Sequence, residues 1–175
     1  MKQFFHFHGK DSSPEGFKAQ FVKRHFPRVI MPPLPNDFLA RREILDGLVT
    51  PGASLSGSSL GGLSALDYAI RFPDTVSGLV LLAPAVGVFD EGVLDGEVVE
   101  FMAGLVVPAG IPTHIIAGIH DEIIPLQAIE DLVARSPEAE IQMYRMEDDH
   151  LLHAPASLDR FLRSLRQVVN GDRIR

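Results

Sequence analysis

Short apolar runs alternate along this chain with segments of helical periodicity, and this alternation constrains the fold more than any other feature. Predicted strands occupy residues 3–7, 28–31, 53–58, 76–83, 113–118 and 140–146. Helical patterns follow at residues 14–25, 36–48 with a cap at Asn36 or Asp37, 60–71, 126–134 and 155–169. Such alternation is typical of βαβ units in a parallel sheet. We therefore predict an α/β fold with an about six-stranded, doubly wound parallel sheet and helices on both faces.

A length of 175 residues is typical of one domain, so we expect residues 1–175 to form a single domain. Only residues 86–112 interrupt the alternation. Their first half is acidic, and the stretch Phe101–Ile111 that follows is apolar and carries no charge. We interpret residues 86–112 as a short lid-like insertion.

Composition excludes several classes of function. The chain has no cysteine, which excludes disulfide scaffolds, thiolate metal sites and cysteine nucleophiles. The net charge is −7 and the acidic residues concentrate between positions 51 and 150, so we expect no nucleic-acid partner. The stretch Phe101–Ile111 is too short to span a bilayer, and the first residues lack a signal-peptide pattern. We expect a cytoplasmic protein with no membrane partner.

The most informative motif is G-x-S-x-G, formed by Gly57, Ser59 and Gly61 between a predicted strand and a predicted helix. In a nucleophile elbow, a strained turn lifts the serine hydroxyl above the sheet, and the glycines allow helix and strand to approach closely. The helix N-terminus that follows also favours a developing oxyanion. Ser59 is the predicted nucleophile; a glycine- and serine-rich turn without chemistry is the alternative.

A serine nucleophile needs a base and an orienting acid. Asp121 follows the fifth predicted strand and His150 follows the sixth, so both fall at the carboxyl edge where the elbow serine lies. The chain order serine, acid, histidine is the order that this architecture uses. Asp121 has an alternative role as a turn or capping residue. Glu122 is the alternative acid, and His153 is the alternative base.

The loop after the first predicted strand, His8-Gly9-Lys10, lies where a hydrolase of this kind takes an oxyanion-hole donor. The second donor is the N–H of the residue after the nucleophile. The backbone N–H groups of Lys10 and Leu60 are therefore the predicted oxyanion hole. We expect His8 to hold the loop by hydrogen bonds rather than to act as a base.

Parts of the sequence also fit two other functions. His6 and His8, together with Asp121 and His150, could supply metal ligands, but a metal site explains neither the elbow nor its glycines. A flavodoxin-like nucleotide or flavin binder would share the sheet, but the chain has neither G-x-G-x-x-G nor G-x-x-x-x-G-K-[ST]. We predict no metal and no organic cofactor.

These motifs resemble those of the α/β-hydrolase superfamily, and more narrowly the small bacterial esterases of the YqiA type. The resemblance spans nearly the whole chain except residues 86–112. It rests on His8-Gly9, Ser12-Ser13-Pro14, Lys18-Ala19, Pro32-Pro33-Leu34-Pro35, Gly57-Ser58-Ser59-Leu60-Gly61-Gly62, Asp121-Glu122 and His150. The sequence departs from the family pattern at Lys10, where an apolar or aromatic residue is common, and at His120, where a glycine is common.

The resemblance implies a carboxylic-ester hydrolase that works through an acyl-serine intermediate. Ser59 would be the nucleophile, His150 the base and then the acid, and Asp121 the residue that orients the imidazole. A short insertion implies an accessible site for short or medium acyl chains, with residues 101–107 either lining an acyl pocket or packing in the core. The expected partner is a small-molecule ester, for a monomer or homodimer. A thioesterase with the same triad, and a non-catalytic binding protein that retains the elbow, are the alternatives.

Overall fold

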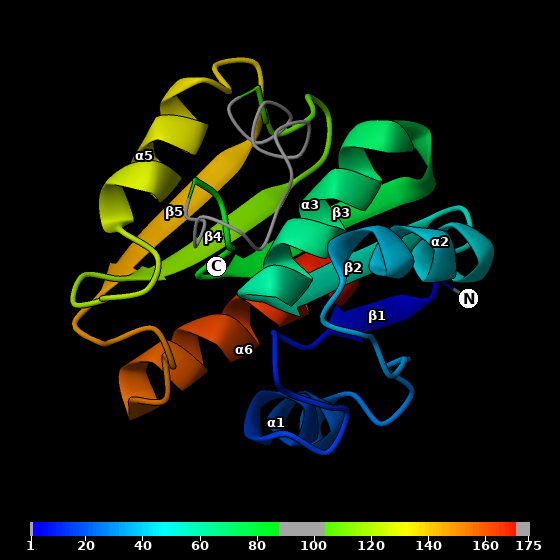
Figure 1. Cartoon of the computed structure of the whole chain (residues 1–175), viewed down its shortest axis with the longest axis horizontal. Coiled ribbons are helices and arrows are strands. Elements are labelled where there is room, and N and C mark those ends of the chain that lie inside the picture. Colours follow the sequence, from blue (N-terminus) through cyan, green and yellow to red (C-terminus); the bar gives the residue numbers. More distant parts are fainter. Residues whose placement is uncertain (1, 88–103, 171–175) are drawn as a thin grey trace.

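A computed structural model describes residues 2–87 and 104–170, which fold around one parallel sheet (Figure 1). Its five strands are hydrogen-bonded in sequence order: β1 (Phe4–Phe7), β2 (Ala53–Ser58), β3 (Val76–Leu82), β4 (Thr113–Gly118) and β5 (Ile141–Met146). The helices are α1 (Phe17–His25), α2 (Phe38–Leu48), α3 (Leu60–Arg71), α5 (Leu126–Ala134) and α6 (Pro155–Asn170), with a 3₁₀ turn, η1, at Pro73–Thr75. The predicted α/β class and parallel sheet are confirmed.

The predicted strand at residues 28–31 is wrong. The segment contributes one bridge, in which Ile30 pairs in parallel with Phe5 on the free edge of β1. The Ile30 N–H donates to the Phe4 carbonyl at 2.8 Å, and the His6 N–H donates to the Ile30 carbonyl at 3.0 Å. Pro27 and Pro32 flank the segment, and a proline has no N–H with which to extend a ladder. The described sheet therefore has five strands rather than six.

The Ile30 bridge also explains why the sheet is doubly wound. After β1 the chain moves outward through α1 to Ile30, and then returns through α2 to β2 on the other side of β1. Right-handed crossovers in opposite directions place their helices on opposite faces of the sheet. Figure 1 shows α2 and α3 in front of the strands, with the end of α6 behind them. The winding reverses at β1, so the predicted doubly wound arrangement holds.

Two apolar cores fill the space on the two faces of the sheet. Successive strand residues point to opposite faces, so Leu79 and Leu81 join one core while Val80 and Leu82 join the other. The first core takes residues from α2, α3 and α5, and the second takes residues from α1 and α6. A strand covered on both faces needs apolar residues at consecutive positions, which is why β3 has a nearly continuous apolar sequence, unbroken from Leu79 to Leu82.

Most element bounds agree with the sequence-based prediction. The strands at 53–58 and 113–118 and the helices at 60–71 and 126–134 have the predicted ends. The Asp37 carboxylate caps α2 by accepting from the Ala40 N–H at 2.7 Å, so Asp37 rather than Asn36 is the cap. Helix α1 begins at Phe17 instead of Pro14 because the Gly16 N–H closes a turn onto the Ser13 carbonyl.

The predicted insertion at 86–112 falls largely outside the described residues, which omit 88–103. Of its apolar half, Leu105 and Val107 are buried in the core of the α2, α3 and α5 face. The Val107 N–H also donates to the Ser136 hydroxyl at 2.8 Å. These two side chains thus pack in the core rather than line a pocket. Within the described ranges, every helix is too short or too polar to cross a membrane.

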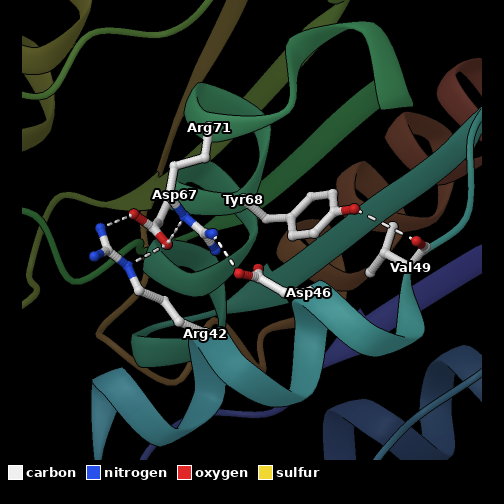
Figure 2. Close-up of polar contacts among 6 residues, drawn as sticks. All are labelled: Arg42, Asp46, Val49, Asp67, Tyr68 and Arg71. Atoms are coloured by element: carbon white, nitrogen blue, oxygen red, sulfur yellow. Dashed lines mark hydrogen bonds and ion pairs between the residues drawn. The ribbon is translucent and has the colours of Figure 1, made fainter.

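Helices α2 and α3 are joined by a network of ion pairs around the buried carboxylate of Asp67 (Figure 2). Arg42 binds both oxygens of Asp67, with its Nε at 2.9 Å and its Nη2 at 2.5 Å. Arg71 Nε lies 3.1 Å from the same carboxylate, and Arg71 Nη1 contacts Asp46 at 2.7 Å. The network fixes α3, the helix that follows the elbow serine, against α2.

Replacing Asp67 by alanine is expected to lower the free energy of unfolding by about 3 kcal/mol, because both arginines lose a carboxylate that is only 1% exposed. Asp46→Ala is the matched control: the Asp46 side chain is 39% exposed, and its loss should cost less than about 1 kcal/mol. Urea unfolding followed by circular dichroism measures both values. Equal small losses for the two variants would contradict a stabilising role for the Asp67 network.

Candidate active site

Ser59 occupies a strained turn between β2 and α3. Its backbone has φ 54° and ψ −120°, a conformation that costs free energy in any residue with a side chain. Neighbouring hydrogen bonds hold it there: the Ser59 N–H donates to the Leu82 carbonyl at 2.9 Å, and the Ala85 N–H donates to the Ser59 carbonyl at 3.1 Å. The hydroxyl makes no capping bond to α3. This half-buried hydroxyl is therefore not committed to helix capping.

Gly57 and Gly61 allow the close approach that the motif predicts. A Cβ atom on Gly57 would lie 2.1 Å from the Gly61 carbonyl oxygen, and one on Gly61 would lie 2.1 Å from the Phe7 carbonyl oxygen. These contacts are with backbone atoms, which cannot rotate away. Both glycines are thus required by the packing of the start of α3 on β2 and on the end of β1.

Asp121 and His150 are brought together by the loops that follow β4 and β5. Nδ1 of His150 lies 2.8 Å from Oδ2 of Asp121, and the two side chains are 14% and 1% exposed. The other Asp121 oxygen, Oδ1, accepts from the N–H groups of Ile123 and Ile124 at 2.8 and 2.7 Å. Asp121 is therefore both the turn residue and the partner of the imidazole. With Nδ1 turned to Asp121, Nε2 is the nitrogen available to another group.

The alternative acid and base lie elsewhere. The Glu122 side chain is exposed, and Nδ1 of the His150 imidazole contacts Asp121 rather than Glu122. His153 is exposed, and its ring lies against Phe17 with a centroid distance of 4.2 Å. His120, at the position that departs from the family pattern, pairs with Glu147 on the surface at 3.1 Å. The geometry thus favours Asp121 and His150 over Glu122 and His153.

The loop that carries His150 is fixed from two sides. Gly118 packs so closely against it that an added Cβ would lie 2.5 Å from the carbonyl oxygens of Asp148 and Asp149. The Asp148 carboxylate accepts from the Ala154 N–H at 2.9 Å and from the Ser157 hydroxyl at 2.6 Å. Burial would raise the pKa of Asp148, but these hydrogen bonds outweigh it and the pKa is lowered. Asp148 therefore supports the loop in its ionised form.

The loop after β1 lies beside the elbow. A Cβ atom on Gly9 would lie 3.3 Å from the Ser58 carbonyl oxygen and 3.4 Å from the Ser59 Cβ, so this loop passes close to the elbow. His8 holds this loop: its Nδ1 contacts the Gly9 carbonyl at 2.9 Å, and its Nε2 accepts from the Leu34 N–H at 3.0 Å. His8 is thus a structural residue, as the sequence predicted.

Arg41, a buried residue of α2, sets the direction of the same loop. Its guanidinium donates to the carbonyl oxygens of His8 at 2.8 Å, Gly9 at 3.2 Å and Pro35 at 2.5 Å. The described peptide bonds are all trans, so the N–H of a peptide points opposite to its C=O. Because Arg41 binds the Gly9 carbonyl, the Lys10 N–H points away from Arg41. Burial lowers the pKa of Arg41 to about 10, which leaves it charged at neutral pH.

Two residues near the elbow were missed as functional candidates. Arg41 is buried on α2 together with Phe38 and Leu45, so a charged residue at a core position of the helical pattern is the signal that could have marked it. Lys18 of α1 reaches the last residue of β2, with its ammonium 2.8 Å from the Ser58 hydroxyl. Lys18 belongs to the Lys18-Ala19 pair that carries part of the family resemblance, but its contact with Ser58 spans 40 residues of sequence and no local pattern predicts it.

The alternative metal site does not form. Among residues 2–87 and 104–170, no group of three or more histidine and acidic side chains is arranged to hold a metal ion. Both nitrogens of His8 are engaged in the loop. Nδ1 of His6 contacts the Ser56 hydroxyl at 2.8 Å, and burial lowers the pKa of His6 to about 3, so this imidazole is a neutral link between β1 and β2.

Comparison with known proteins finds no relative by sequence but many similar solved structures. The sequence matches no protein-family model and no curated protein. A proposed hydrolase from Agrobacterium vitis superposes with a TM-score of 0.78 and 22% identity, over 96% of this chain and 88% of that one. The mouse α/β hydrolase domain-containing protein 10 superposes with a TM-score of 0.74 and 19% identity, over 97% of this chain and 90% of that one. Esterase PE8 superposes with a TM-score of 0.68 and 18% identity, over 95% of this chain and 92% of that one.

These identities are too low to transfer an activity, but the superpositions cover nearly all of each chain. The narrower resemblance to esterases of the YqiA type stays a prediction. The parallel sheet, the strained serine between β2 and α3, and the histidine–aspartate pair after β5 and β4 agree with the same architecture. The chain has the α/β-hydrolase fold.

Proposed function

We propose that this protein is a serine hydrolase that cleaves carboxylic esters of short or medium acyl chain through an acyl-serine intermediate. The observation that carries the proposal is the Asp121–His150 hydrogen bond of 2.8 Å, at the sheet edge where Ser59 sits in its strained turn. Strands β2 to β5 are neighbours in one parallel sheet, so the loops at their carboxyl ends share one edge. That edge gathers a nucleophile, a base and an acid.

In the proposed reaction, Nε2 of His150 takes the hydroxyl proton of Ser59 as Oγ attacks the ester carbonyl carbon. The imidazolium then gives that proton to the leaving alcohol as the C–O bond breaks. A water molecule, deprotonated by the same nitrogen, next attacks the acyl-serine, and the acid is released as Ser59 regains its proton. Asp121 keeps the imidazole in the tautomer with Nδ1 protonated and stabilises its charged form.

The backbone N–H groups of Lys10 and Leu60 are the proposed oxyanion hole. Leu60 is the first residue of α3, where N–H groups have no partner within the helix. The Lys10 N–H belongs to the peptide whose carbonyl is bound by Arg41, so it is directed away from that guanidinium. Donors fixed before the reaction stabilise the oxyanion without reorganisation, which is a large part of catalysis in this class.

The remaining features of the proposal concern the substrate and the assembly. The partner is a small-molecule ester, and the protein acts as a monomer or homodimer in the cytoplasm, without nucleic acid or membrane. The reaction needs no metal and no organic cofactor. A thioester would react through the same steps, since only the leaving atom differs. Hydrolysis of p-nitrophenyl butyrate and of a butyryl thioester, compared at equal concentration, distinguishes the two substrate classes.

A fluorophosphonate probe and intact mass spectrometry test the proposal directly. We expect one adduct on the wild-type protein and none on Ser59→Ala, because the probe reacts with an activated serine. Ser58→Ala, which changes the neighbouring hydroxyl, should still be labelled. Wild-type protein that is neither labelled between pH 6 and 9 nor able to turn over p-nitrophenyl acetate or butyrate would instead be a binding protein that retains the elbow.

A further inference from the structure

Lys18 places a positive charge directly behind the elbow. Its ammonium, on α1, donates to the Ser58 hydroxyl at 2.8 Å, and Ser58 is the last residue of β2 and the neighbour of Ser59. Ser58 is buried, with 7% of its surface exposed. Consecutive strand residues point to opposite faces, so Ser58 meets α1 from the side of the sheet covered by α1 and α6.

The same ammonium lies within the electrostatic reach of the acid and of the histidine loop. It is attracted by the carboxylates of Asp148, Asp121 and Asp149, named in order of decreasing effect. The ammonium also acts on two imidazoles, those of His153 before α6 and His6 on β1: burial lowers the pKa of each most, and the Lys18 charge lowers it further. Lys18 is therefore bound to the end of β2, which carries the serine, and its charge acts on Asp121 and on the loop that carries His150.

From this placement, and resting on the proposed function, we propose that Lys18 is a positioning residue of the hydrolase site. It anchors the strand end behind Ser59 through Ser58, and it offsets the negative charge of Asp121, Asp148 and Asp149. Lys18 touches no reacting atom in this role. It acts through Ser58 and through its field.

The field matters because the reaction creates a negative charge. Attack on the ester carbonyl forms an oxyanion, and carboxylates nearby oppose it. A cation in a partly buried site reduces that opposition more than one in water would. The hydrogen bond of a charged ammonium is also roughly twice as strong as that of a neutral amine. Loss of the charge should therefore lower kcat more than it changes KM.

The charge of Lys18 is sensitive to pH near neutrality. Burial lowers its pKa from 10.5 to about 8, although the three aspartates act in the opposite direction. Lys18 is thus an ammonium below pH 8 and loses its charge above it. The proposal predicts an activity that falls as pH rises through about 8. Arginine stays charged throughout this range, so Lys18→Arg should move the fall to higher pH.

Steady-state hydrolysis of p-nitrophenyl butyrate by Lys18→Met, Lys18→Arg and Lys23→Met tests the role. We expect kcat of Lys18→Met to fall about 10- to 100-fold with KM within about twofold, less than the roughly 100- to 1,000-fold loss of a direct oxyanion donor, because Lys18 acts only through Ser58 and through its field. Lys18→Arg should recover most of the rate. Lys23, an exposed lysine on the same helix, is the matched control and should leave kcat unchanged. Equal kcat values for Lys18→Met and Lys23→Met in an active enzyme would overturn the role of Lys18.

A second measurement does not require turnover. Burial lowers the pKa of His153 most, and the charge of Lys18 lowers it further. NMR titration should therefore find the His153 pKa raised in Lys18→Met, relative to the wild type, and unchanged in Lys23→Met. An unchanged His153 titration in Lys18→Met would contradict the placement of the charge. A wild-type protein without esterase activity or probe labelling would overturn the proposed function itself, whereas an active enzyme with an insensitive Lys18 overturns only this inference.

Discussion

Replacing Asp121 by asparagine is expected to lower kcat about 10,000-fold while the protein stays folded. The asparagine oxygen can still accept from the N–H groups of Ile123 and Ile124, so the turn after β4 keeps its hydrogen bonds. Its amide NH₂ would then face Nδ1 of His150, which favours the tautomer with Nε2 protonated. Nε2 could no longer accept the proton of Ser59. The expected loss is therefore in the chemical step, with KM nearly unchanged.

The control for this prediction is Glu122→Gln, which removes the neighbouring exposed carboxylate. We expect kcat within about twofold of the wild-type value, as for a surface substitution. The pair His150→Gln and His153→Gln tests the base in the same way, with the large loss expected only at His150. A large loss at Glu122 with a small one at Asp121, measured as kcat on p-nitrophenyl butyrate, would show that the solution structure pairs His150 with a different acid.

Sequence reasoning worked best where burial on two faces leaves a strong pattern. Strand β4 is buried along its whole length, and its apolar run Ile115–Ala117 is the pattern expected of a strand covered on both faces. The segment at 28–31 has the same kind of run, but the neighbouring prolines limit it to the single bridge at Ile30. A pattern of apolar residues shows that a segment is buried; the backbone donors next to it decide whether it joins a ladder.

The residues of the candidate site also differ in how far the sequence predicts them. Ser59, Asp121 and His150 could be predicted as site residues because the topology brings the ends of neighbouring parallel strands to one edge, and chain order then selects the loops. Arg41 and Lys18 could not be found this way. Arg41 binds backbone carbonyls, which every sequence offers, and the Lys18 contact depends on how α1 packs against the end of β2. Such supporting residues become visible only when the packing is known.

The elbow glycines give the largest expected effect on stability. In Gly61→Ala the new Cβ would lie 2.1 Å from the Phe7 carbonyl oxygen and 2.6 Å from that of His8. Either β1 or α3 must move, and both carry parts of the site. We expect a loss of more than about 4 kcal/mol in the free energy of unfolding, or an insoluble protein, since backbone cannot relieve the clash by rotation. Gly57→Ala, at 2.1 Å from the Gly61 carbonyl oxygen, should behave alike.

Gly47→Ala is the matched control, because a Cβ atom there would meet nothing within 4 Å. Gly47 lies inside α2, where alanine is favoured over glycine by about 0.5 to 1 kcal/mol, so this variant should be slightly more stable than the wild type. Urea unfolding of the variants, with soluble yield as a second measure, compares the same chemical change in two environments. If Gly61→Ala unfolded at the same urea concentration as Gly47→Ala, α3 would have room to move away from β1. The elbow would then not need glycine for packing, and the strained backbone of Ser59 would have to be maintained by its hydrogen bonds to β3 and the loop after it.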